Sequence, residues 1–238
     1  GMDFLPGTGV FREGENIVSS QLGLVSISNR LVKLIPLTGK YVPKRGDTVI
    51  GKVVTMTFSN WFVDIGCSNE AVMSLRDTPE FIDKGADLSQ YYNFGDVIVA
   101  KIEKVTRNAI DLTMRTPGLR ELGPGKLIKV TASKVPRIIG KEGSMITLIK
   151  DKTGCKIIVG QNGVVWLQGE PDQELLAVNA LRKIESESHI SGLTDRIKAF
   201  LDGEVKRLHL TPGRNVSSGS DGSGVSGRSE FSEREFQQ

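Results

Sequence analysis

The sequence predicts a multidomain protein that is mainly β with an α+β part, and three observations support this prediction. Short β-rich runs, separated by glycines and polar turns, fill the first half of the chain. A β-α-α-β-β-α order of apolar patterns follows them. A segment rich in glycine and serine ends the chain. The length of 238 residues leaves room for more than one domain, since a domain takes roughly 100–200 residues.

Residues 1–43 are expected to form a small N-terminal β domain. Two apolar runs, Leu22–Val25 and Leu31–Ile35, lie on either side of the polar turn Ser28–Arg30. This alternation is typical of β-hairpins. The candidates for an apolar surface that docks on a partner are Val18, Leu24, Val25 and Ile27. A small β core would use the same residue types, so the sequence leaves both interpretations open.

Residues 44–117 contain a clearer series of strands. The five candidates are Thr48–Thr55, Trp61–Ile65, Ala71–Leu75, Val97–Val105 and Ala109–Met114. Gly46-Asp47 and Gly95-Asp96 each open a strand, and Arg107-Asn108 makes a tight turn between the last two. Five short strands with an irregular stretch before the fourth fit a small closed barrel of the OB type.

Residues 118–209 change to an α+β pattern. The candidate elements are strands at Lys126–Thr131, Lys156–Val159 and Val164–Leu167, and helices at 143–153, from Pro171 onward, and at Leu193–Leu208. Leu176, Ala180 and Ile184 repeat at the spacing of one helix face. Residues 210–238 hold few side chains that could pack a core, so we expect a disordered tail.

A glycine loop between two predicted helices is the most informative motif. Its residues are Gly140, Lys141, Glu142 and Gly143. Glycines let a ligand approach the backbone closely because no Cβ intervenes. The unpaired amides at the start of the following helix favour a phosphate, and Lys141 adds a mobile positive charge. The basic cluster between Lys126 and Lys156 also suits a polyanionic partner.

In this loop and in the order of elements, residues 122–190 resemble a KH domain of the type I order. In KH domains the GxxG loop clamps about four nucleotides of single-stranded RNA. The resemblance implies RNA contacts at Gly140, Lys141, Glu142, Gly143, Arg137 and Ile139. Glu142 departs from the most favourable pattern, because its carboxylate would repel a phosphate if it pointed inward.

The barrel region resembles an S1 RNA-binding domain in the segments Gly46–Val53, Trp61–Gly66 and Gly95–Ile102. Barrels of this kind bind single strands by stacking bases on aromatic side chains. The resemblance implies RNA contacts at Phe58, Trp61, Phe62, Arg76, Lys101 and Arg107. Because neighbours along a strand point to opposite faces, one of Trp61 and Phe62 is expected in the core.

The order of a β-rich N-terminal region, an S1 domain and one KH domain resembles the RNA-binding cap subunit of the archaeal exosome, the family of ribosomal RNA-processing protein 4. Leu5–Thr8 is similar to that family's proline-glycine opening. The resemblance implies that three cap subunits sit on a hexameric ring of ribonuclease PH-like subunits, where the N-terminal domain docks. The cap binds single-stranded RNA and directs its 3′ end to the phosphorolytic sites of the ring.

The turn Gly160-Gln161-Asn162-Gly163 is similar to the GxNG element of exosome KH domains. Asn162 and Gly163 suit the positive φ angles of a type I′ turn. We therefore interpret Gly160, Asn162 and Gly163 as a structural turn and not as an RNA contact.

The reactive residues argue against an enzyme. His189 and His209 have no cysteine or histidine at metal-ligand spacing. The sequence holds no GxSxG motif and no P-loop. The carboxylates of the barrel region are scattered, at Asp64, Asp77, Asp83 and Asp87. We expect no catalytic residue, no metal and no cofactor.

The cellular setting is expected to be the cytoplasm. No apolar run approaches the ~18 residues of a membrane span, and the first residues lack the pattern of a signal peptide. Cys67 and Cys155 lie far apart, one in each RNA-binding module, which is no disulfide framework.

Two alternatives remain at this stage. A free-standing S1 and KH factor could act in translation or in transcription elongation. A nuclease with appended S1 and KH modules would need a catalytic domain larger than residues 2–43 can provide. We also expect that Gly140→Asp with Gly143→Asp weakens RNA binding and leaves the fold intact.

Overall fold

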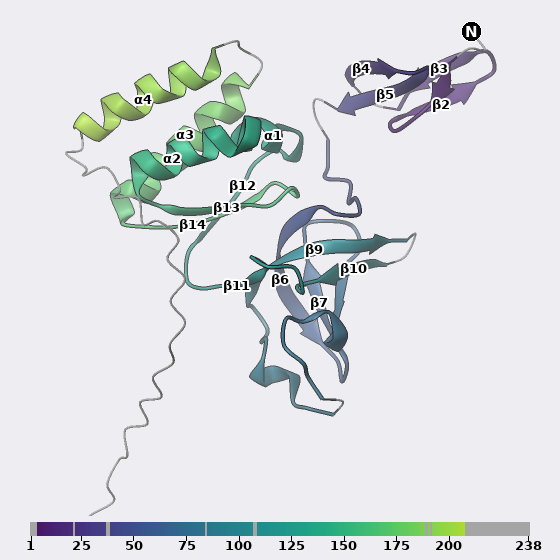
Figure 1. Ribbon diagram of the computed structural model, residues 1–238, viewed down its shortest axis with the longest axis vertical. Coiled ribbons are helices and arrows are strands. Elements are labelled where there is room, and N and C mark those ends of the chain that lie inside the picture. Colours follow the sequence, from purple (N-terminus) through teal and green to yellow (C-terminus); the bar gives the residue numbers. More distant parts are fainter. Residues whose placement is uncertain are drawn as a thin grey trace, which may run out of the picture.

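A computed structural model describes residues 4–20, 22–36, 39–83, 85–106, 109–188, 190 and 192–207, with Ile35 and Pro36 described by their backbone alone. Figure 1 shows three parts in chain order: N-terminal sheets, a β-barrel, and a helical layer on a sheet. The predicted disordered tail, 210–238, lies outside the described residues.

The N-terminal part consists of β-hairpins, as the sequence predicts. Its strands are β1 (Leu5–Pro6), β2 (Val10–Glu13), β3 (Asn16–Ser19), β4 (Gly23–Ser28) and β5 (Leu31–Pro36). β2 and β3 form one hairpin, and β1 joins the β4–β5 hairpin as a strand parallel to β5. Asn29 and Arg30 both have positive φ, 46° and 67°. Two such residues form the tight turn that matches the twist of a hairpin.

The middle part is the predicted five-stranded closed barrel. Its strands are β6 (Thr48–Met56), β7 (Asn60–Asp64), β8 (Ala71–Ser74), β9 (Val97–Val105) and β10 (Ile110–Thr113). The order β10-β8-β7-β6-β9 closes through the pairing of β10 with β9. Two 3-10 helices, η1 (Leu75–Asp77) and η2 (Leu88–Gln90), precede β9. A short strand beyond residue 117, β11 (Arg120–Leu122), extends the sheet at β9.

The C-terminal part has the predicted β-α-α-β-β-α order followed by a further helix. Its elements are β12 (Lys126–Lys129), η3 (Ala132–Lys134), α1 (Val135–Ile139), η4 (Lys141–Gly143), α2 (Ser144–Thr153), β13 (Lys156–Val159), β14 (Val164–Gln168), α3 (Pro171–Glu187) and α4 (Leu193–Arg207). β14 is the central strand and is antiparallel to β12 and β13. The helices cover one face of this sheet (Figure 1). The predicted helix from Leu193 ends at Arg207, and Leu208 lies outside the described residues.

A small cluster of buried side chains lies between the barrel and the sheet of the C-terminal part. Ile50 and Val99 of the barrel, Leu122 of β11 and Trp166 of β14 form one buried cluster. The indole Nε1 of Trp166 donates a hydrogen bond to the carbonyl of Gly123, 3.2 Å away. The short segment between the two parts is therefore held against the sheet, and the two parts pack as one unit.

Candidate nucleic-acid interface

The GxxG loop has a backbone that few side chains would accept. Gly140, Glu142 and Gly143 have φ angles of 76°, 53° and 80°. The amide of Gly140 donates to the carbonyl of Pro136 at 3.0 Å and so ends α1. No side chain caps α2, whose first residue is Ser144. The amide of Ser144 donates to the carbonyl of Lys141 in η4, and the amide of Gly143 donates to the carbonyl of Gly140 at 3.3 Å. The loop therefore runs directly into α2, and its glycines leave the backbone open to close approach by a ligand.

The side chains of Lys141 and Glu142 are both exposed. Neither is tied into the protein by an ion pair that would hold it away from a ligand among the bridges of the described residues. Lys141 is free to reach a phosphate near the loop. Glu142 lies beside the same site, so its carboxylate opposes the approach of an anion.

Gly140 and Gly143 differ in how much space surrounds them. A Cβ added to Gly140 would lie 2.7 Å from both the backbone nitrogen and the Cβ of Met145. Met145 is buried in the core of this domain. A Cβ added to Gly143 would meet nothing within 4 Å. A side chain at Gly140 therefore requires the first turn of α2 to shift, which counts against the expectation that an aspartate pair leaves the fold intact, whereas at Gly143 the space for the side chain agrees with it.

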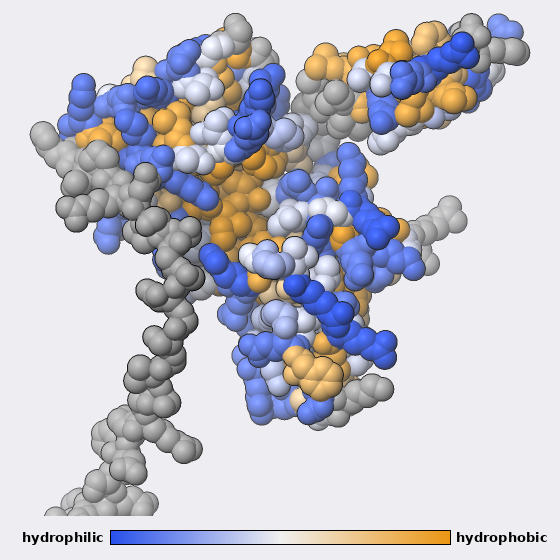
Figure 2. Space-filling model, in the orientation of Figure 1, coloured by the Kyte–Doolittle hydropathy of each residue, from blue (hydrophilic) through white to orange (hydrophobic). Residues whose placement is uncertain are grey.

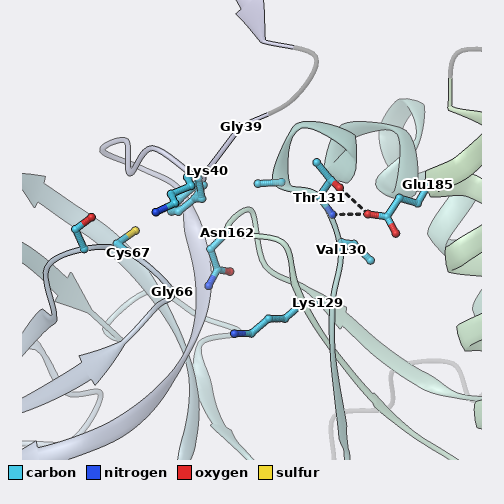
Figure 3. A pocket seen from close by; sticks show the side chains of 12 residues that line it. Gly39, Lys40, Gly66, Cys67, Lys129, Val130, Thr131, Asn162 and Glu185 are labelled. Atoms are coloured by element: carbon cyan, nitrogen blue, oxygen red, sulfur yellow. Dashed lines mark hydrogen bonds between the residues drawn. The ribbon is translucent and has the colours of Figure 1, made fainter. Parts of the chain in front are cut away.

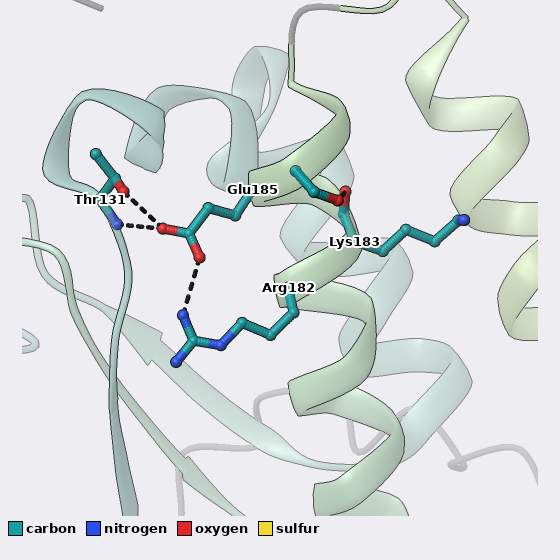
Figure 4. A network of polar contacts seen from close by, with 5 residues as sticks. Thr131, Arg182, Lys183 and Glu185 are labelled. Atoms are coloured by element: carbon teal, nitrogen blue, oxygen red, sulfur yellow. Dashed lines mark hydrogen bonds and ion pairs between the residues drawn. The ribbon is translucent and has the colours of Figure 1, made fainter. Parts of the chain in front are cut away.

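A carboxylate network fixes the segment that leads into the loop (Figure 4). Glu185 of α3 accepts hydrogen bonds from the amide and the hydroxyl of Thr131, at 2.6 and 2.7 Å. It also pairs with Arg182 at 2.9 Å. Burial raises the pKa of Glu185, but these hydrogen bonds and the Arg182 charge outweigh it and leave the pKa below its usual value. The network anchors the end of β12 just before η3 and α1.

The GxNG turn inserts into the barrel and not into solvent. Asn162 is buried, and its Nδ2 donates to the carbonyls of Ile50 and Ile65 at 2.8 and 2.9 Å. Its Oδ1 accepts from the amide of Ile50 at 3.2 Å. Gln161 exchanges two further hydrogen bonds with the backbone of Thr48. Asn162 and Gln161 thus make hydrogen bonds with the backbone of β6 of the kind that a neighbouring strand would make.

The geometry of the turn explains why glycine occupies positions 160 and 163. A Cβ on Gly160 would lie 2.3 Å from Oδ1 of Asn162 and 2.9 Å from the nitrogen of Ile50. Gly163 has φ of 82°, whereas Asn162 does not adopt a positive φ. The type I′ prediction is therefore wrong at Asn162. Gly163 donates its amide to the carbonyl of Gly160 at 3.0 Å, as in a type I turn followed by a left-handed glycine.

Trp61 is a core residue and not an RNA contact. It has no exposed surface. Its ring meets Tyr92 edge-on, with 5.4 Å between the ring centres, and its Nε1 donates to the carbonyl of Tyr92 at 3.1 Å. Phe62 is half-buried on the opposite face of β7. The prediction that one of these two residues lies in the core is confirmed, and the structure shows that this residue is Trp61.

The other predicted barrel contacts lie outside the core. Phe58 is 97% exposed, in the turn between β6 and β7. Arg76 lies in η1, close to this turn, because the amide of its neighbour Leu75 donates to the carbonyl of Ser59. Lys101 is half-buried on β9. Arg107 lies outside the described residues.

Two exposed aromatic residues near the barrel are not among the RNA contacts predicted from the sequence. Phe81 and Phe94 are 90% and 71% exposed. Both come from the irregular stretch between η1 and β9, where no strand alternation assigns a face. The only signal for their exposure in the sequence is that polar residues lie beside them.

The N-terminal part carries a large exposed apolar surface (Figure 2). Leu24, Val25 and Ile27 of β4 are each about 60% exposed, and Val18 is half-buried. Val25 and Ile27 point to one face of the strand and Leu24 to the other. β4 is the edge strand of its small sheet, and the apolar side chains on its two faces lack the packing that would bury them.

Within the described ranges, no three histidine, cysteine, aspartate or glutamate side chains lie close enough together to hold a metal ion. The helices of those ranges are too short or too polar to cross a membrane. Cys67 and Cys155 are both free thiols.

Comparisons with known proteins agree with this geometry. A family model for the KH domain matches residues 126–183, and one for the S1 domain of Rrp4 matches residues 40–82. The exosome complex component Rrp4 of Pyrococcus abyssi is 47% identical over 208 residues, which cover 85% of this chain and 78% of that protein. The chain belongs to the Rrp4 family.

Other Rrp4 proteins show the same extent of similarity. Rrp4 of Thermococcus kodakarensis is 46% identical, over 86% of this chain and 82% of that protein. Rrp4 of Methanothermus fervidus is 43% identical, over 84% of this chain and 90% of its own length. A crystal structure of a protein assigned as an exosome complex RNA-binding protein superposes with a TM-score of 0.63 and 36% identity, over 72% of this chain and 99% of that one.

Proposed function

We propose that this Rrp4-family protein is a non-catalytic RNA-binding cap component of an archaeal exosome. It binds single-stranded RNA and directs the 3′ end into a phosphorolytic ring for degradation and processing. The observation that carries the proposal is the fixed pairing of two single-strand-binding modules. Asn162 holds the KH domain on the barrel, so the GxxG loop and the outer barrel face keep one relative position.

Each module has a separate chemical part in RNA binding. The loop Gly140–Gly143 offers a backbone with little side-chain cover and the charge of Lys141 to phosphates, with Arg137 and Ile139 beside it. The barrel offers Phe58 and Phe62 for base stacking, a contact that contributes ~1–3 kcal/mol per base. Arg76 and Lys101 would contact the RNA backbone. Neither module supplies a nucleophile in this scheme, and chain cleavage belongs to the ring.

The domain extents follow from these roles. Residues 1–43 form the docking domain, 44–117 the S1 domain and 118–209 the KH domain with its C-terminal helix, and the first strand after residue 117, β11, pairs with β9 of the barrel. The exposed apolar side chains of β4 support docking of the first domain on a ring of ribonuclease PH-like subunits. Three copies per ring and action in the cytoplasm complete the proposal.

The test uses the purified full-length chain and a reconstituted ring. The chain alone should bind a fluorescein-labelled single-stranded RNA, bind the matching duplex weakly, and leave the RNA length unchanged. Added to the ring, it should speed phosphate-dependent shortening from the 3′ end. Shortening of RNA by the chain alone would refute the non-catalytic assignment. Equal affinity for the duplex would refute the single-strand function.

A further inference from the structure

A groove lies between the GxxG side of the KH domain and the segment that leads into the barrel. We call this segment, residues 39–44, the linker. The groove has a volume of about 510 Å³, within the ~300–1,000 Å³ typical of ligand sites. Its walls include Lys40, Tyr41 and Val42 of the linker and Pro136, Ile139 and Gly140 of the KH domain. One wall thus comes from outside the KH domain.

The linker wall is held in place before any ligand arrives. The hydroxyl of Tyr41 donates to the carboxylate of Asp47 at 2.6 Å. The side chain of Tyr41 packs against the barrel core. Burial and the Asp47 carboxylate both raise the pKa of Tyr41 above its usual value, so this hydroxyl stays protonated. A wall fixed in advance lowers the ordering cost of binding.

The groove has an apolar floor that is open to solvent. Val42 is 64% exposed, Pro136 is exposed and Ile139 is half-buried. All three line the same groove. Flat bases of an unpaired strand can lie against aliphatic side chains of this kind, whereas a duplex hides its base faces.

The rim of the groove is strongly basic. Lys40, Lys44 and Asp47 line the groove, and the Asp47 carboxylate accepts the hydrogen bond of Tyr41. The KH segment that walls the groove, 132–143, adds Lys134, Arg137 and Lys141 against Glu142. Five cations against two carboxylates leave a net charge of +3 on these residues. An apolar floor with a basic rim fits a single-stranded polyanion.

A second cleft, of about 560 Å³, continues from the same linker on the side of the GxNG turn. Figure 3 shows Lys40 from the linker and Lys129 from β12 on either side of Asn162 in this cleft. The carboxylate of Glu185, which lines this cleft, already accepts hydrogen bonds from Thr131 and pairs with Arg182. A strand that leaves the GxxG loop can pass Lys40 and continue along the domain junction toward the barrel.

We infer that the linker completes the RNA groove of the KH domain. Lys40 and Lys44 contact phosphates of the strand held at the GxxG loop, and Val42, with Pro136 and Ile139, contacts its bases. The inference rests on the proposed RNA-binding function and adds a site on the linker, outside the KH domain. The KH domain alone would lack one wall of this groove.

The first test compares two lysine pairs in the full-length chain by fluorescence anisotropy with a short fluorescein-labelled single-stranded RNA. Lys40→Ala with Lys44→Ala removes two phosphate contacts. Lys198→Ala with Lys206→Ala removes the same charge from α4. For single strands each phosphate contact contributes ~0.7 to the slope of log K against log salt, so the linker pair should lower the slope by ~1.4 and the affinity ~25-fold at about 0.1 M salt. The α4 pair should change affinity less than ~3-fold.

The second test maps the contact directly. The same RNA carries one 4-thiouridine, is irradiated with the protein, and is digested with trypsin and ribonuclease. Trypsin releases the linker peptide Tyr41–Lys44 and the loop peptide Ile138–Lys141. Both should carry the nucleotide, and excess polyglutamate, which has charge and no bases, should compete weakly.

The outcomes separate the two levels of the argument. RNA binding at normal affinity by the Lys40 and Lys44 variant, with a nucleotide on the loop peptide alone, overturns the linker site and leaves the proposed function intact. Equal competition by polyglutamate overturns the role of the apolar floor. Absence of RNA binding by the unaltered chain refutes the proposed function itself.

Discussion

Replacing Asn162 by alanine should loosen the KH domain from the barrel. The change removes three hydrogen bonds, to the amide and carbonyl of Ile50 and the carbonyl of Ile65. A buried polar group that loses its partner costs ~1–3 kcal/mol. Because Asn162 borders a cleft from which water can enter, we take the lower value for each group, about 3 kcal/mol in total. In a chain of this size that lowers Tm by about 6–12 °C.

Calorimetry and hydrogen exchange measure this effect. The amide of Ile50 should exchange faster in Asn162→Ala, and the melting of the barrel and KH domain should separate. Gln161→Ala is the matched control, because its exposed side chain makes one bond to Thr48 and should cost about 1 kcal/mol or less. Asn162→Asp keeps the shape and loses both donors, so it should destabilise as well. Equal Tm and equal Ile50 exchange in Asn162→Ala and Gln161→Ala would refute the reasoning.

Three further predictions concern the loop, the barrel and the carboxylate network. Trp61→Ala should cost ~3–5 kcal/mol of stability, whereas Phe58→Ala should leave stability within ~0.5 kcal/mol and weaken RNA binding by ~1–3 kcal/mol. Urea unfolding measures the stability of both variants, and fluorescence anisotropy measures RNA binding. A destabilised Phe58→Ala variant would contradict the prediction. Glu142→Gln should tighten RNA binding ~2–5-fold, since a carboxylate beside phosphate is removed; unchanged affinity would place the RNA elsewhere. Because the folded pKa of Glu185 is lowered, its stabilisation is present above the unfolded pKa of ~4.3 and is lost as pH falls through the folded value. The stability gap between the unaltered chain and Glu185→Gln should shrink in that window, and a gap independent of pH would contradict the assignment.

Most of the fold could be predicted from the sequence, because the periodicity of strands and the residues that form turns are local features of the chain. The five barrel strands and the β-α-α-β-β-α order are both present in the structure. The strand β11 was not predicted, since three residues offer too little alternation to recognise. Alternation also separated Trp61 from Phe62, but it could not say which one is buried. That depends on Tyr92, which reaches Trp61 from the irregular stretch before β9.

The candidate site was less accessible from the sequence, because its contacts are long-range. The glycine loop could be located from Gly140 and Gly143, but the collision of a side chain at Gly140 with Met145 depends on the packing of α2. The GxNG turn could be recognised as structural. Its partner Ile50 lies 112 positions away in the sequence, and no local pattern indicates that contact.

The mass and composition of the complex that copurifies with this protein from its own cells test the central claim most directly. A large particle with three copies of this chain on a six-membered ring of ribonuclease PH-like subunits is the result that we predict. A lone monomer, or a particle that contains ribosomes or RNA polymerase in place of such a ring, would contradict the cap assignment and favour a free-standing RNA-binding factor.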